Sequence, residues 1–179
     1  GKQDLIQIGL NKRDIVIGLA ASGRTPYVLG GLAYAKQLGC HTAAISNTHH
    51  SKIGEVAEIA VDVPVGAEVL TGSTRLKSGT AEKMILNMIS TATMVGLGKA
   101  YQNLMVDVMQ TNEKLRNRAE NIVMEATGVE RSVARATIDA AKGSCKVAIT
   151  MILANCSYED ALMRLQQACG HVREAIMEK

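Results

Sequence analysis

The clearest indication of the fold is the segment Asp14-Ile-Val-Ile-Gly-Leu-Ala-Ala-Ser-Gly-Arg-Thr-Pro-Tyr27. Its apolar part, residues 15–19, predicts a buried strand, because unbroken runs rich in β-branched residues are typical of parallel sheets. A loop of small residues follows, and Pro26 suits the first turn of a helix, where its missing N–H costs little. A strand, a tight loop and a helix in direct succession form the repeating unit of an α/β fold.

The same alternation continues to residue 65. We predict a helix over residues 27–38, which Gly39 ends, and a short helix over residues 52–58. Two further strands are predicted over residues 42–46 and 59–65. The pattern indicates a parallel α/β sheet with right-handed crossovers.

The first predicted strand has too few partners. Residues 15–19 are almost all apolar, as in a central strand with neighbours on both sides. Only two further strands are predicted, so we expect strands upstream of Gly1 to be missing from this sheet. Residues 15–19 would then form an exposed apolar edge.

No strand is predicted after Thr74. The expected helices cover residues 81–98, 101–108, 111–125, 132–141, 144–153 and 158–177. We divide the chain into an α/β part, residues 1–118, and a small helical domain, residues 119–179. The helical domain resembles a ubiquitin-associated three-helix bundle in layout, but we infer no ubiquitin binding from this. The alternative is a helical lid or a dimerisation appendage.

Composition excludes several classes of protein. The net charge of +3 combines 20 basic with 17 acidic residues, which are interspersed, so no basic stripe indicates nucleic acid or a membrane surface. Aromatic residues make up 2%, which leaves few platforms for base stacking. The cysteines lie far apart, and no apolar run suits a signal peptide or a membrane span. We expect a cytoplasmic protein with reduced thiols.

The loop at residues 20–25 carries the first candidate binding residues. Backbone N–H groups at a helix start lack partners within the helix, and the helix dipole adds partial positive charge, so both favour a phosphate. Ser22 and Thr25 add hydroxyl donors. Gly23 lets the backbone approach the anion, and Arg24 adds charge. The alternative is that Ser22 only caps the helix, but the carboxyl end of a strand favours a ligand site.

Residues 65–80 form the second candidate, a loop dense in hydroxyls and glycines. Ser73 can bond sugar hydroxyls or cap the next helix. Arg75 and Lys77 lie two residues apart, so they share a side only where the backbone is extended. Glu68 can act as an acid or base, or orient a cation. A solvated loop before a capped helix is the alternative.

The three histidines of the α/β part, His41, His49 and His50, indicate no metal site. A metal needs convergent ligands, and no further His, Cys or carboxylate stands at a helpful spacing. The first loop also lacks the Walker A lysine, the dinucleotide glycine spacing and the G-x-S-x-G frame of a hydrolase nucleophile.

Four motifs in order resemble those of the N-acetylmuramic acid 6-phosphate etherases, which belong to the sugar isomerase (SIS) domain family. They are residues 18–27, residues 68–80, Asn103-Leu-Met-Val-Asp-Val108 and Thr111-Asn-Glu-Lys-Leu-Arg116. The resemblance implies a doubly wound five-stranded parallel sheet and a homodimer. It also implies loss of D-lactate from N-acetylmuramic acid 6-phosphate in cell-wall sugar recycling, with no metal and no organic cofactor.

The resemblance also assigns roles. Ser22, Gly23 and Thr25 match a hydroxyl-rich loop that faces the sugar phosphate. Ser73, Arg75 and Lys77 match a segment that closes over the ligand, and Glu68 matches a family glutamate. The two glutamates assigned to proton transfer are expected upstream of Gly1, so we name no catalytic residue here. The alternatives are a non-catalytic sugar-phosphate regulator similar to the glucokinase regulatory protein, an aldose–ketose isomerase and a DNA-binding sugar sensor.

Overall fold

The structure is a computed structural model that describes residues 1–177. The chain divides into two compact units, Gly1–Met88 and Ile89–Lys179, and each is described by itself. The predicted domain boundary after residue 118 lies further along the chain than this division and stays a prediction. No helix within residues 1–177 is long and apolar enough to cross a membrane.

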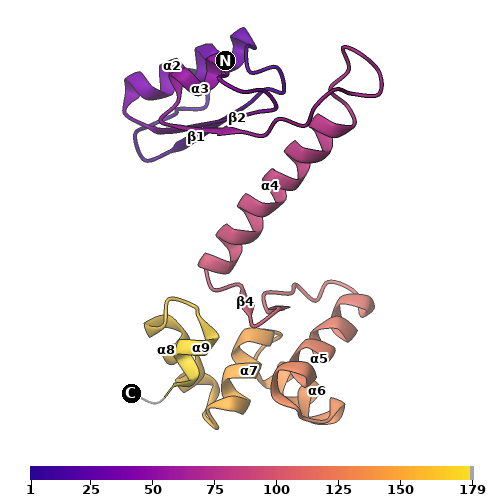
Figure 1. Cartoon of the computed structure of the whole chain (residues 1–179). Helices are drawn as coiled ribbons and strands as arrows, with labels where there is room; N and C mark the ends of the chain where they lie inside the picture. The colour runs from indigo at the N-terminus through magenta and orange to yellow at the C-terminus, as the bar shows by residue number, and fades with distance from the viewer. Residues whose placement is uncertain (178–179) are drawn as a thin grey trace. The chain divides into compact units, whose positions relative to one another are not determined.

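The first unit is built on a parallel sheet of three strands in the order β1-β2-β3 (Figure 1). The strands are β1 (Ile15–Leu19), β2 (His41–Ser46) and β3 (Ile59–Asp62). In the register, Ile17 pairs with Ala43, and Ala43 pairs with Ile59. All three predicted strands and the α/β fold class are therefore confirmed.

Helices cover one face of this sheet. The helices of this unit are α1 (Lys2–Gln7), α2 (Pro26–Leu38) and α3 (Lys52–Val56). Helix α4 (Lys77–Gly96) also begins in this unit. Leu32 of α2 and Ile53 of α3 are buried against Ala20 and Ala44. Gly39 ends α2 at φ 85°, as predicted. Helix α1 was not expected, because its short pattern gave no cap or apolar stripe.

The opposite face of the sheet is bare. Cross-strand partners share a face, and the exposed fractions are 67% for Ile15, 37% for Ile17 and 59% for Ile59. Strand β1 pairs only with β2, so it lies at the edge of the sheet. The expected apolar edge at residues 15–19 is confirmed. The expectation of a buried strand is wrong, because helices pack on only one side of it.

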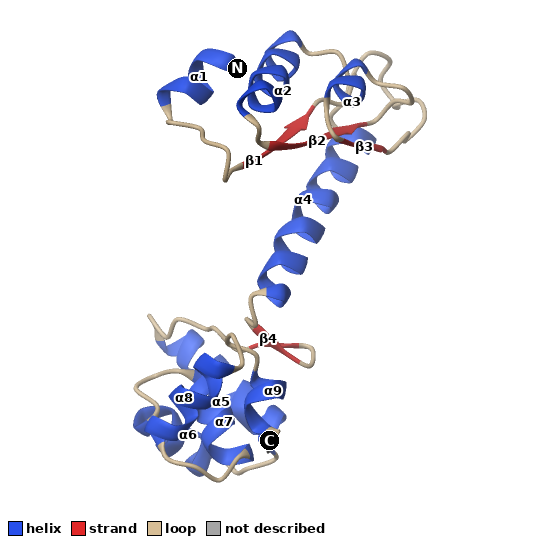
Figure 2. Cartoon of the chain, turned by 90° about the vertical axis from the view of Figure 1, so that its left-hand side faces the viewer, coloured by secondary structure: helices blue, strands red, loops and turns tan. Residues whose placement is uncertain are grey.

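The second unit is a cluster of helices with a short hairpin (Figure 2). Its elements are β4 (Ala100–Tyr101), β5 (Leu104–Met105), α5 (Glu113–Thr127), α6 (Arg131–Ala140), α7 (Cys145–Leu153), α8 (Tyr158–Gln167) and α9 (Val172–Ile176). Helix α7 lies at the centre, where Ala148 and Ile149 are fully buried. The core also takes residues from the hairpin and the other helices, so this unit encloses its own apolar interior.

Two predicted helices of the second unit are wrong. Residues 101–108 form a hairpin and an extended segment, because Gly98 and Gln102 adopt φ of 69° and 55°, which end a helix. Residues 158–177 form two helices, since Cys169 and Gly170 adopt φ of 50° and 84°. The expected three-helix bundle is therefore a larger cluster that includes α5.

Candidate functional site

The carboxyl ends of the three parallel strands gather the candidate loops of the first unit. Parallel strands end at one edge of a sheet, and ligands of open α/β sheets bind beyond that edge. The loop after β1 is tied to the loop after β2, because Asn47 N–H donates to Ala21 O at 3.0 Å and Ile53 N–H donates to Gly23 O at 3.0 Å. The two loops therefore form one structural unit.

Gly23 lies where the loop after β1 packs closely against the loop after β2. It adopts φ 64°, and a Cβ on it would lie 2.3 Å from Ser51 Cβ and 3.1 Å from Thr48 Cγ2. From the sequence we expected this glycine to let the backbone approach an anion. In the structure its small size is required by the neighbouring loop.

The start of α2 is open to a ligand. Thr25 is its N-cap residue and makes no side-chain cap bond, so the first backbone N–H groups of the helix are not satisfied by a capping side chain. The exposed side chains of Ser22, Arg24 and Thr25 form no hydrogen bond or ion pair within the part of the chain that the structure describes. The alternative in which Ser22 caps the helix is therefore wrong, and the donors at this helix end remain available.

A polar network that the sequence analysis did not identify follows β2 and β3. Ser46 Oγ donates to Asp62 Oδ1 at 3.0 Å, and His50 N–H donates to Asp62 Oδ2 at 3.0 Å. Asn47 Nδ2 donates to Val63 O at 3.1 Å, while its buried Oδ1 accepts no hydrogen bond from any residue among 1–177. Buried acceptors without partners are rare and often occur at functional sites. The available signal was the polar residues at the ends of two predicted strands.

The histidines lie on the surface of this unit. His41 Nδ1 is 2.9 Å from Glu58 Oε2, an interaction that lowers the pKa of Glu58, and the side chains of His49 and His50 are exposed. Among residues 1–177, no group of three His, Cys, Asp or Glu side chains is placed to hold a metal ion.

Glu68 of the second loop has a structural role. Its Oε2 accepts from Lys77 N–H and its Oε1 from Ser78 N–H, each at 3.1 Å, so this carboxylate satisfies the start of α4. These two backbone bonds lower the pKa of Glu68, which keeps it ionised. A cap of this kind stabilises the helix that follows the loop.

The remaining residues of the second loop are available. Ser73 Oγ accepts from Arg75 N–H at 3.3 Å, while the exposed side chains of Arg75 and Lys77 have no partner among the described residues. No hydrogen bond within residues 1–177 joins this loop to residues 20–25. The structure thus positions the two loops separately, and their joint role in binding stays a prediction.

Glu82 of α4 is a further carboxyl group that the sequence analysis missed. Its Oε1 is buried without a hydrogen-bond partner in the described structure. Burial raises the pKa of Glu82, because desolvation disfavours the charged form. Its position in the helix predicted over residues 81–98 gave no signal, since a glutamate in a helix is ordinarily solvated.

Comparison with known proteins identifies the relatives of the chain. Residues 8–92 match the SIS domain family. The chain is 57% identical over 174 residues to an N-acetylmuramic acid 6-phosphate etherase of Geobacillus sp.. The aligned region covers 97% of this chain and 59% of that protein. The chain is a homologue of these etherases. The resemblance that the four motifs indicated is therefore confirmed.

Two further etherases show a similar degree of identity to the chain. The proteins of the same name from Bacillus anthracis and Oceanobacillus iheyensis are each 55% identical, over 98% and 97% of this chain. The chain spans about 60% of the length of the curated etherases that it matches. The sequence similarity extends through both units, so the helical unit is shared with these relatives as well.

Proposed function

We propose that the chain is the sugar-phosphate-binding part of a carbon–oxygen lyase that acts on N-acetylmuramic acid 6-phosphate. The identity of 55–57% to curated etherases over at least 97% of the chain carries this proposal. The open start of α2 supports it, because unpaired backbone N–H groups with Ser22 and Thr25 suit a phosphate. Arg24, Ser73, Arg75 and Lys77 add further exposed donors to the ligand.

The proposed reaction proceeds through the ring-opened aldehyde. A carboxylate removes the C2 proton, the C3–oxygen bond breaks so that D-lactate leaves, and water adds at C3 to give N-acetylglucosamine 6-phosphate. Removal of a proton next to a carbonyl suits a carboxylate of tuned pKa. We assign this proton transfer to no residue of this chain. Its loops hold the phosphate and the sugar hydroxyls in place during the reaction.

The test transfers this chain into a curated relative. A chimera carries the chain in place of the matching 174 residues of the Geobacillus etherase, and D-lactate release from N-acetylmuramic acid 6-phosphate is measured. We expect release by the chimera and weaker sugar-phosphate binding after Ser22→Ala. Ser132→Ala, in the second unit, is the matched control and should change neither.

Each outcome of this transfer has a distinct meaning. A folded chimera that binds N-acetylglucosamine 6-phosphate but releases no D-lactate would favour a non-catalytic regulator. A folded chimera that binds neither N-acetylglucosamine 6-phosphate nor the non-phosphorylated sugar would overturn the proposal. Equally tight binding of N-acetylglucosamine 6-phosphate and the non-phosphorylated sugar would mean that the start of α2 does not bind the phosphate.

We also propose a cytoplasmic homodimer. Helix α4 supports the dimer, because Met84, Met88 and Val95 are exposed and their spacing places them on one face of the helix, which a second copy would cover. Light scattering of the purified chain should give twice its mass of 19.1 kDa. Met88→Glu should give the monomer mass, and Lys83→Glu, which changes an exposed polar position of the same helix, should not.

A further inference from the structure

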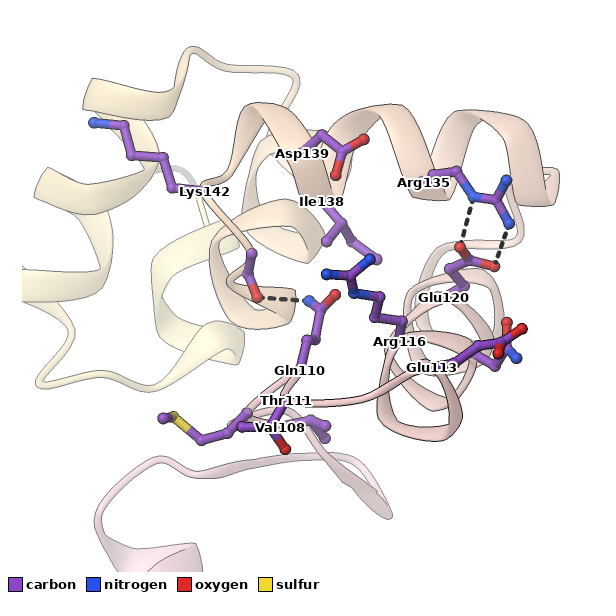
Figure 3. Close-up of a pocket in the computed structure, with 13 residues that line it drawn as sticks. Val108, Gln110, Thr111, Glu113, Arg116, Glu120, Arg135, Ile138, Asp139 and Lys142 are labelled. Carbon is purple, nitrogen blue, oxygen red and sulfur yellow. Dashed lines mark hydrogen bonds and ion pairs between the residues drawn. The ribbon is translucent and has the colours of Figure 1, made fainter.

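The second unit contains a polar cavity that the proposed sugar site does not use. Its volume is about 1020 Å³, and it lies between residues 108–111, α5, α6 and the turn before α7 (Figure 3). Volumes of this order are typical of small-molecule sites. Every element around it belongs to the second unit.

Hydrogen bonds and ion pairs fix the walls of this cavity. Glu120 Oε1 accepts from Arg135 Nε at 2.7 Å, and Glu120 Oε2 accepts from Arg131 Nη1 at 2.7 Å. Both guanidinium groups lower the pKa of the buried Glu120, so it stays ionised and holds α6 against α5. On the opposite wall, Gln110 Nε2 donates to Gly143 O at 2.7 Å. A cavity with walls fixed in this way is preorganised for a ligand.

Two of the three cationic side chains that line the cavity already have partners within the protein. Arg135 is paired with Glu120, and Lys142 Nζ lies 4.4 Å from the centre of the Tyr158 ring. The side chain of Arg116 in α5 is exposed and has no ion pair or hydrogen bond in the described part of the chain. Figure 3 shows its guanidinium group between Gln110 and Ile138, in the space below Asp139. This cation is therefore available to a ligand carboxylate.

Asp139 of α6 supplies the complementary charge. It raises the pKa of Arg135 by its field but forms no ion pair with it. No ion pair within 4.0 Å joins it to Arg116 either, so the two opposite charges face one space without neutralising each other. The side chains of Val108 and Ile138 line the same cavity, and both residues are at least nine-tenths buried. The cavity thus combines an unpaired cation and an unpaired anion on walls that buried apolar residues support from behind.

We propose that this cavity binds a short peptide in its zwitterionic form. The peptide carboxylate pairs with Arg116, and its ammonium group pairs with Asp139. A purely anionic ligand would be repelled by Asp139, and a purely cationic ligand would be repelled by Arg116. The cavity volume leaves space for two or more residues rather than a single amino acid.

The test titrates the 179-residue chain with valyl-valine by calorimetry or by NMR shifts. The matched ligands are N-acetyl-valyl-valine, which lacks the ammonium group, and valyl-valine amide, which lacks the carboxylate. We expect valyl-valine to bind at least about tenfold more tightly than either, which corresponds to 1.4 kcal/mol. Equal binding of the acetylated form, or of inorganic phosphate, would make this an anion site and overturn the proposal.

Matched variants locate the binding. Arg116→Gln and Asp139→Asn should each weaken valyl-valine binding about tenfold or more, since each removes one of the two ion pairs. Arg118→Gln changes an exposed arginine of the same helix that does not line the cavity, and it should bind as the unchanged chain does. Circular dichroism checks that the helices persist. Binding that survives both cavity variants in folded protein, or no binding by the unchanged chain, would refute the inference.

Discussion

The two units differ in how completely they bury their apolar residues. The helical unit encloses its core, with α7 in the centre and Ile149 fully buried. The sheet unit has a small core around Leu32 and Ile53, while Ile15 and Ile59 remain exposed on the other face. A unit that buries more apolar area has more hydrophobic stabilisation. We therefore expect the unit that carries the candidate sugar-phosphate loops to be the less stable of the two.

The substitutions with the largest expected effect test this difference in stability between the helical unit and the sheet unit. Ile149→Ala should destabilise the helical unit by about 3 kcal/mol, as is typical of a fully buried isoleucine, and Ile53→Ala should do the same to the sheet unit. Hydrogen exchange at increasing urea reports each unit separately. In the unchanged chain we expect the sheet unit to exchange at lower urea.

The two alanine variants should also act locally. Ile149→Ala should bring the urea midpoint of the helical unit toward that of the sheet unit, and Ile53→Ala should leave the helical unit unaffected. One shared transition in all three proteins would show that the units unfold as one and would break the comparison.

The next effect concerns the close contact between the two strand-end loops. Gly23→Ala should destabilise the sheet unit by about 2–3 kcal/mol, since it combines a strained φ with a Cβ 2.3 Å from Ser51 Cβ. Gly9→Ala is the matched control, because Gly9 has φ 71° and open space around its Cβ. It should cost about 1 kcal/mol. Equal losses in chemical denaturation would mean that the contact with Ser51 is unimportant.

A smaller effect is expected in the ion-pair cluster of the helical unit. Glu120→Gln should destabilise this unit by about 1–3 kcal/mol, because a buried charged acceptor for two arginines is lost. The pKa of Glu120 is lowered in the folded state, so its contribution is present above the ordinary pKa of 4.5 and is lost as pH falls through the folded value.

Urea midpoints of the helical unit measured between pH 7 and pH 3 check this sign. The unchanged chain should lose more stability on acidification than Glu120→Gln. Parallel pH profiles would contradict the assignment of this effect to Glu120.

The smallest effect compares two helix starts of the sheet unit. Ser51 Oγ accepts from Gly54 N–H at 3.1 Å, so Ser51→Ala should cost about 1 kcal/mol. Thr25 makes no cap bond, so Thr25→Ala should cost less than about 0.5 kcal/mol and should instead weaken binding of N-acetylglucosamine 6-phosphate. Equal stability losses would indicate that Thr25 is an ordinary cap and would weaken the proposed phosphate site.

Much of the first unit followed from local sequence. The strand at residues 15–19 and the glycine stop at residue 39 depend on neighbouring residues, and both were predicted. The hairpin at residues 100–105 was missed, because a run of apolar residues does not distinguish a strand from a buried helix. Its turn depends on the positive φ of Gln102, which side-chain type alone does not reveal.

Some candidate site residues could be identified from the sequence, and others could be identified only from the structure. Sequence identified Ser22, Arg24 and Thr25 because they stand between a strand and a helix, where phosphate sites form. It could not show that Glu68 caps α4, or that Asp62 accepts bonds from two residues of the preceding strand and loop. Each of these bonds depends on the path of an irregular loop, and loop paths are set by packing rather than by local propensity.

Residue order and local conformational preference were enough to predict the strand–loop–helix order and the likeness to the etherases. That the start of α2 is open followed only from the structure, because the sequence left Ser22 as a possible cap. Only the tertiary structure decided which face of the sheet is bare, why position 23 must be glycine, and that Arg116 and Asp139 face one cavity. These features join residues that are distant along the chain, so they exist only once the elements have packed.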